Sequence, residues 1–99
     1  MSNYVPHYTK KKQVLARKEL ALERRIANKD PIVKVMVSAG EVRDARIRVL
    51  QARRSTLPPT SNSYALCKKI DEQIEQLATT SLDSILLEFG YTTDDDNSS

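Results

Sequence analysis

The stretch that decides the fold runs from Asp30 to Arg54 and reads DPIVKVMVSAGEVRDARIRVLQARR. Asp30 followed by Pro31 is typical of a helix start, because a carboxylate accepts free amides and proline suits the first turn. Pro58 and Pro59 then prevent the helix from continuing. A helix of about 37 Å would result. We therefore expect this stretch to be the element along which the rest of the chain packs.

Two features of this stretch leave its structure open. Residues 32–37 are rich in β-branched side chains, which favours a strand as the alternative to a helix. Ser38 and Glu41 together form a capping box, and Gly40 costs roughly 1 kcal/mol inside a helix, so a break near 38–40 is a second alternative. A helix on both sides of Ser38 is the preferred interpretation, because the sequence offers no partner strand.

The rest of the chain also shows helical patterns. Helices are expected at about residues 9–28, 62–79 and 81–89, in addition to 31–54, with an extended arm at 1–8 and a disordered acidic tail at 92–99. Ser61, Asn62 or Ser63 is expected to cap the helix of 62–79, whose apolar seam is Cys67, Ile70, Ile74 and Leu77. The sequence thus predicts an all-α protein, either a small helical bundle or an elongated helical hairpin of three to four helices, within one domain.

Charge is unevenly divided along the chain. Residues 1–60 carry fourteen Lys and Arg against five acidic residues, a balance of +9, and residues 61–99 carry two against eight, a balance of −6. Such a chain either folds its two halves against each other or presents the basic half to an acidic partner.

Arginines and aliphatic residues share one face of the helix at 31–54. A face of this kind favours a partner that buries methyl groups and supplies anions, since arginine combines bidentate pairing with a buried stem. Asp71, Glu72 and Glu75 of the same chain, or carboxylates of another chain, are the candidate anions. The first function expected is therefore a non-enzymatic protein-interaction module (assembly, adaptor or inhibitor protein) that self-associates or binds an acidic protein. Its expected partner-binding residues are Arg43, Arg46, Leu50, Arg53 and Arg54.

The alternative function is nucleic-acid binding by the basic N-terminal half. The acidic tail would then compete for the same surface. Three consecutive lysines lie near a helix start, where cations are mildly unfavourable, so either they serve something outside the helix or they form a solvated charge run, which is the preferred interpretation. The expected contacts are Lys10, Lys11, Lys12, Arg17, Arg24 and Arg25.

A short amphipathic helix closes the pattern. Leu82, Ile85, Leu86 and Phe89 recur at helical spacing and would form a second interaction stripe if the core does not use them. Gly90 stands where a left-handed C-terminal stop is expected, with Tyr91 folding back onto Leu86.

Catalytic and cofactor chemistry have little to build on. His7 is the only histidine and Cys67 the only cysteine, and neither a metal cluster nor a glycine-rich phosphate loop is readable. We expect no enzyme activity, no cofactor and no small-molecule substrate. The sequence contains no apolar run of membrane-spanning length, so no membrane partner is expected, and a single cysteine fits a reducing, cytoplasmic compartment.

Overall fold

A computed structural model of the chain describes residues 7–91. They form four α-helices: α1 (His7–Ala27), α2 (Ile32–Ser55), α3 (Ser61–Thr79) and α4 (Leu82–Glu88). The expectation of an all-α fold is confirmed, and no strand occurs within residues 7–91. Residues 32–37 are helical, and α2 passes through Ser38 and Gly40 without a break.

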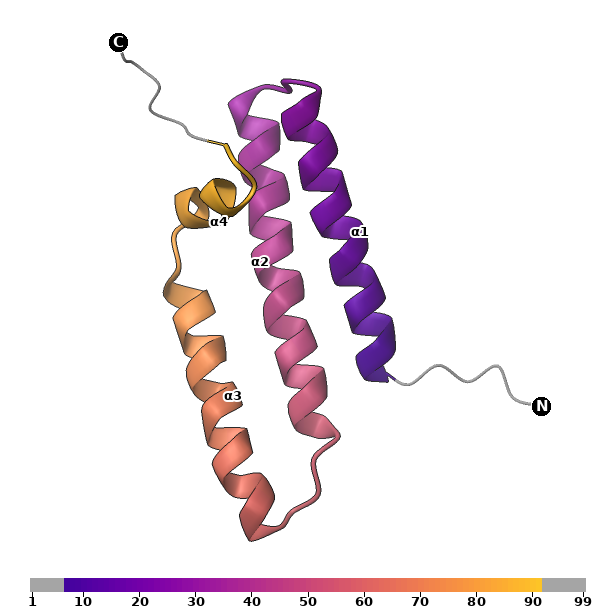
Figure 1. The fold of residues 1–99 in the computed structure, drawn as a ribbon, viewed down its shortest axis with the longest axis vertical. Helices are drawn as coiled ribbons and strands as arrows, with labels where there is room; N and C mark the ends of the chain where they lie inside the picture. The colour runs from indigo at the N-terminus through magenta and orange to yellow at the C-terminus, as the bar shows by residue number, and fades with distance from the viewer. Residues whose placement is uncertain (1–6, 92–99) are drawn as a thin grey trace, which may run out of the picture.

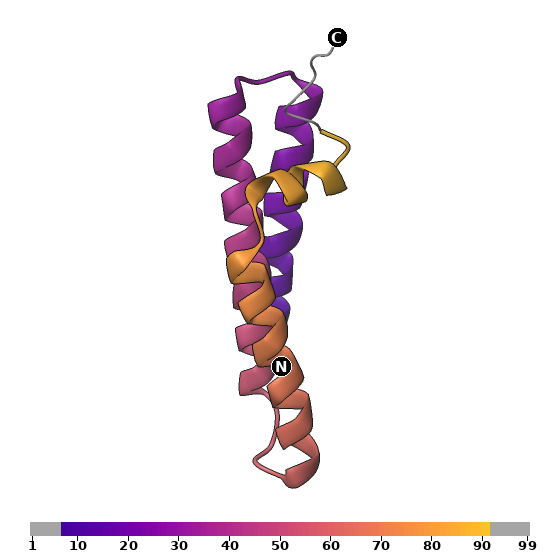
Figure 2. The same cartoon turned by 90° about the vertical axis from the view of Figure 1, so that its left-hand side faces the viewer.

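The long helix α2 lies at the centre of the molecule. It packs against α1, α3 and α4, whereas those three make no close backbone contact with one another. The three long helices run up, down and up in nearly one layer, and α4 lies across them (Figures 1 and 2). The molecule measures 55 × 35 × 16 Å. It is therefore a flat, extended helical arrangement organised on α2, as the sequence suggested.

Helix starts differ from the expected ones by one or two residues. Helix α1 begins at His7, within the stretch expected to be an arm, while residues 1–6 and the tail at 92–99 lie outside the described part of the chain. Pro31 is the residue that precedes α2, and no side chain caps that helix. Thr60 caps α3 by accepting a hydrogen bond from the amide of Ser63, so the expected caps at residues 61–63 were wrong by at least one residue.

Two helices end in the same left-handed motif. At the end of α1, Lys29 takes a φ of 57°, and the amide of Asp30 donates to the carbonyl of Arg25. At the end of α4, Gly90 takes a φ of 79°, and the amide of Tyr91 donates to the carbonyl of Leu86. The stop predicted at Gly90 is confirmed. The stop at Lys29 was not predicted, because glycine normally occupies this position.

The core lies where α4 covers the contact between α1 and α2. Ile85 and Leu86 of α4 are fully buried there, and Phe89 and Tyr91 pack around them. Leu22 of α1 and three residues of α2 complete the buried cluster: Val35, Ala39 and Val42. By contrast, Ile70 is the single fully buried residue of α3. The upper part of the molecule in Figure 1 is thus better packed than the lower part, where α3 contacts α2 alone.

Candidate interaction surfaces

The α2 arginine face, defined as Arg43, Arg46, Leu50, Arg53 and Arg54, turns toward α3 and α4. The guanidinium of Arg43 donates to the carbonyl of Thr80 at 3.1 Å. Arg54 Nε lies 2.8 Å from an oxygen of Asp71 on α3. Leu50 is half-buried, and Arg53 is exposed. Most of this face therefore makes contacts within its own chain.

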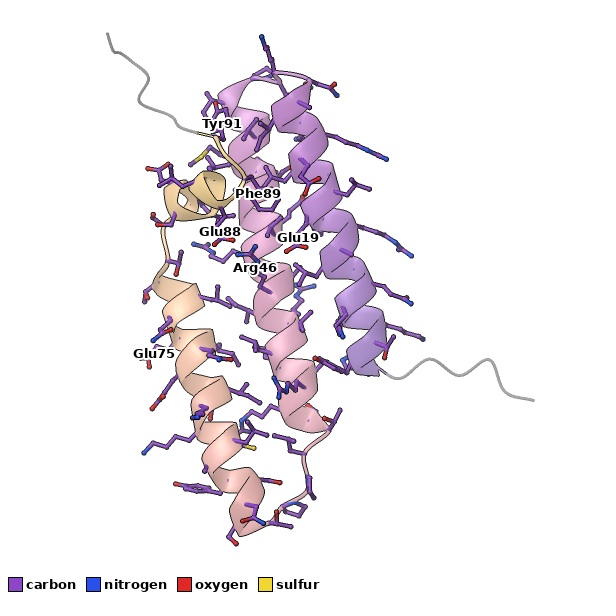
Figure 3. All side chains as sticks on the ribbon, viewed as in Figure 1. Glu19, Arg46, Glu75, Glu88, Phe89 and Tyr91 are labelled. Atoms are coloured by element: carbon purple, nitrogen blue, oxygen red, sulfur yellow. The ribbon has the colours of Figure 1, made fainter. Side chains whose placement is uncertain are left out.

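Arg46 is the most enclosed of these cations and joins three helices. Its guanidinium reaches both oxygens of Glu88 on α4, at 2.9 and 3.2 Å, and an oxygen of Glu19 on α1 at 3.3 Å (Figure 3). Only 21 % of the Arg46 side chain is exposed. The hydrogen bond to Glu88 raises the pKa of Arg46 above its usual value, although burial acts in the opposite direction. The pair is bidentate, a geometry that holds α4 in a fixed orientation.

The acidic partners agree only in part with those considered from the sequence. Asp71 pairs with Arg54, which is one of the intramolecular contacts anticipated. Glu75 points away from α2 at the outer edge of α3 (Figure 3), and neither it nor Glu72 forms an ion pair within residues 7–91. Glu19 and Glu88 were not anticipated as partners. Whether the face also binds another molecule stays a prediction.

The second interaction stripe is used by the core. Ile85 and Leu86 are fully buried, and Leu82 and Phe89 pack against the buried cluster. Most of this stripe is therefore not an open surface, and Leu82, which is partly buried, is the member that also lines a groove at the surface. From the sequence, these residues were expected to form an interaction stripe only if the core did not use them. The core does use them.

An exposed apolar patch lies on the N-terminal half of α2. Ile32, Val33 and Val37 are 44, 69 and 53 % exposed. Together with Met36, Gly40 and Leu82 they line one shallow groove between α2 and the start of α4. We refer to these six residues as the α2 apolar patch. Sequence reasoning missed it, although Val33 and Val37 lie roughly 150–170° around the helix from the residues of α2 that are buried, Val35, Ala39 and Val42.

The basic residues of α1 are spread around that helix. Lys10, Arg17 and Arg24 are exposed and recur every seven residues, which places them within about 40° on the helix. We call these three the α1 basic face. The other three candidates point elsewhere: Lys11 lines a groove against α2, Lys12 lies 5.2 Å above the ring of Tyr8, and Arg25 donates to the carbonyl of Lys34 at 2.9 Å.

The groove beside Lys11 runs between α1 and α2. Two adjoining depressions share Lys11 and Arg48. One of them also contains Lys18, whose ammonium lies 3.4 Å from Glu41. The other contains His7. Cations of two helices thus meet in this concavity, together with the carboxylates of Glu41 and Asp44.

Groups suited to catalysis or metal binding are not assembled in the part of the chain that the structure describes. No cluster of three or more His, Cys, Asp or Glu side chains occurs within residues 7–91. His7 lies on α1 in the groove, while Cys67 lies on α3 and is partly buried. None of the described helices combines the length and apolar character that crossing a membrane requires.

Comparison with protein-family models, with curated proteins and with solved structures finds no match for this chain. Its function is therefore argued from its surfaces alone.

Proposed function

We propose that this chain is a non-enzymatic protein-interaction module that self-associates through the α2 apolar patch. The observation that carries the proposal is the exposure of Val33 and Val37, each more than half exposed, beside Ile32 and Met36 in one groove. Contiguous apolar surface of this kind marks interaction sites, since each buried methylene contributes about 0.8 kcal/mol.

A second copy of the chain is the partner that fits best. The radius of gyration is 16.5 Å, against about 13 Å for a compact domain of about 100 residues. Helical domains normally bury their apolar faces between two layers, and here the three long helices form nearly one. A copy related by a twofold axis would place the same aliphatic patch against itself and supply the second layer.

The lining of the patch also favours an apolar partner. All six residues of the α2 apolar patch lack charged groups. An acidic or basic partner would therefore gain no pairing there, whereas a second patch of the same composition would. On the α2 arginine face, by comparison, Arg46 and Arg54 already have carboxylate partners within the chain.

Self-association is tested by replacing Val33 and Val37 with glutamate. Light scattering after size exclusion should show the mass of the wild-type chain rising from monomer toward dimer as the concentration increases to high micromolar. The V33E/V37E variant should remain monomeric, because a dimer would bury four carboxylates without partners. Both positions are exposed, and glutamate favours a helix more than valine does, so the fold should persist by circular dichroism.

The matched control is L20E/L87E, which introduces two glutamates at similarly exposed apolar positions on α1 and α4. This control should dimerise like the wild type. A wild-type chain that stays monomeric, or a V33E/V37E variant that dimerises as well as the control, would refute the proposal.

A further inference from the structure

The outermost helix of the flat molecule presents a line of cations. Only α2 packs against α1, so the opposite side of α1 is open (Figure 1). Lys10, Arg17 and Arg24 lie along that side, each about 10.5 Å from the next at the helical rise. The line is straight and rigid, because all three residues belong to one uninterrupted helix.

The cations of the α1 basic face lack anionic neighbours. No acidic residue stands three or four positions before or after any of them, and those are the positions that meet on a helix surface. None of them forms an ion pair within residues 7–91. Arg46 and Arg54 of α2, in contrast, both have carboxylate partners. The α1 basic face is therefore open to an anionic partner from outside the described part of the chain.

The start of α1 strengthens this positive surface. Its first twelve residues, 7–18, contain five Lys or Arg and no acid. The first turn of the helix has no acidic residue to balance the positive end of the helix dipole. Lys11 and Arg48 lie in the adjoining groove, whose lining also includes Glu41 and Asp44. A bound anion would be attracted both by the cations and by the positive end of the helix dipole. Its binding would offset the destabilisation that lysines cause near a helix start.

We propose that the α1 basic face binds the phosphate backbone of nucleic acid without reading its sequence. The cations are regularly spaced along a rigid helix. They therefore suit the phosphate backbone of a nucleic acid, in which every nucleotide contributes one negative charge along a line. Beside Lys10 and Arg17 lies a smaller depression that also contains Gln13 and Val14, whereas the larger apolar groove, which suits the hydrophobic anchor of a peptide, lies on α2.

The test measures binding of a fluorescently labelled mixed-sequence DNA duplex by anisotropy over a range of salt concentrations. Three phosphate contacts, from Lys10, Arg17 and Arg24, give a slope of log K against log salt of about −2.7, or roughly a 40-fold loss between about 50 and 200 mM. The K10E/R17E variant should bind at least tenfold more weakly, with a slope smaller by about 2.

The matched control is K68E/K69E, which makes the same change in charge at two exposed lysines of α3. This control should retain most of the affinity. Equal losses in the two variants would show that only net charge matters and would refute the site. An absence of duplex binding at low salt would also overturn the proposal. So would tighter binding to anionic lipid vesicles than to the duplex.

This surface does not depend on self-association through the α2 apolar patch. The two occupy different helices, so the V33E/V37E variant should bind one duplex per chain even if it is monomeric. Failure of one proposal is therefore distinguishable from failure of the other.

Discussion

Arg46 of α2 and Arg17 of α1 carry the same charged group into opposite surroundings. Arg46 is 21 % exposed and lies within 3.3 Å of carboxylate oxygens from two other helices. Arg17 is exposed, and no acidic residue stands three or four positions before or after it in the helix. The two residues show that cations of the basic N-terminal half have unlike surroundings: Arg46 connects three helices, whereas Arg17 is exposed and forms no ion pair within residues 7–91.

The ion pairs show how little of the charge imbalance folding neutralises. Two pairs connect the basic and acidic halves of the chain, Arg46 with Glu88 and Arg54 with Asp71. Two others, Lys18 with Glu41 and Arg46 with Glu19, lie within the basic half. The fold thus directs its few carboxylate partners mainly toward α2, and the α1 basic face remains positive.

The largest effect on stability is expected from charge reversal at Arg46. In R46E, three carboxylates would meet at one half-buried point, so we expect a loss of about 3 kcal/mol in the free energy of unfolding. Reversal at Arg17 should change it by no more than about 0.5 kcal/mol. Urea unfolding followed by circular dichroism measures both. Similar losses in R46E and R17E would remove the distinction between the two helices.

A smaller effect is expected at Arg54. Its pair with Asp71 joins α3 to α2, but both side chains are about half exposed. Such a pair contributes about 0.5 kcal/mol and is screened by salt. The coupling measured in a double-mutant cycle of R54A and D71A should therefore be small at low salt and vanish at about 1 M salt. Coupling of several kcal/mol, or coupling that salt does not reduce, would contradict this.

Local signals were the part of the structure that the sequence could predict. The all-α fold, the left-handed stop at Gly90 and the continuation of α2 into a long helix each depend on neighbouring residues. The seam of α3 follows from spacing in the same way, and Ile70 is its fully buried member. The stop at Lys29 was missed, because the backbone there adopts a conformation that its residue type does not favour.

The candidate surfaces were harder to predict, because they depend on where α4 docks. Glu88 meets Arg46 only when α4 lies across α2, and no spacing along the chain encodes that crossing. The same docking buries Ile85 and Leu86 and leaves Val33 and Val37 outside the core. The α1 basic face was readable, since its seven-residue spacing and its lack of nearby acids are both visible in the sequence.

The smallest effect, and the one that separates function from stability, is expected at Lys10. This residue lies in the first turn of α1, where a cation opposes the helix dipole and an anion complements it. In K10E the free energy of unfolding should rise by about 0.5 kcal/mol. Duplex affinity should fall in the same variant, because a phosphate contact is replaced by repulsion.

Lys69 provides the control for this last comparison. It is exposed in the middle of α3, away from either end of the helix, so K69E should gain nothing from the dipole and should lose about 0.5 kcal/mol, because Glu72 stands three residues further on, while the affinity stays nearly unchanged. A K10E variant that loses stability would mean that Lys10 contributes to the fold as Arg46 does. A variant that gains stability and loses affinity would show that α1 keeps its lysine at a cost to the helix because the charge is used outside it.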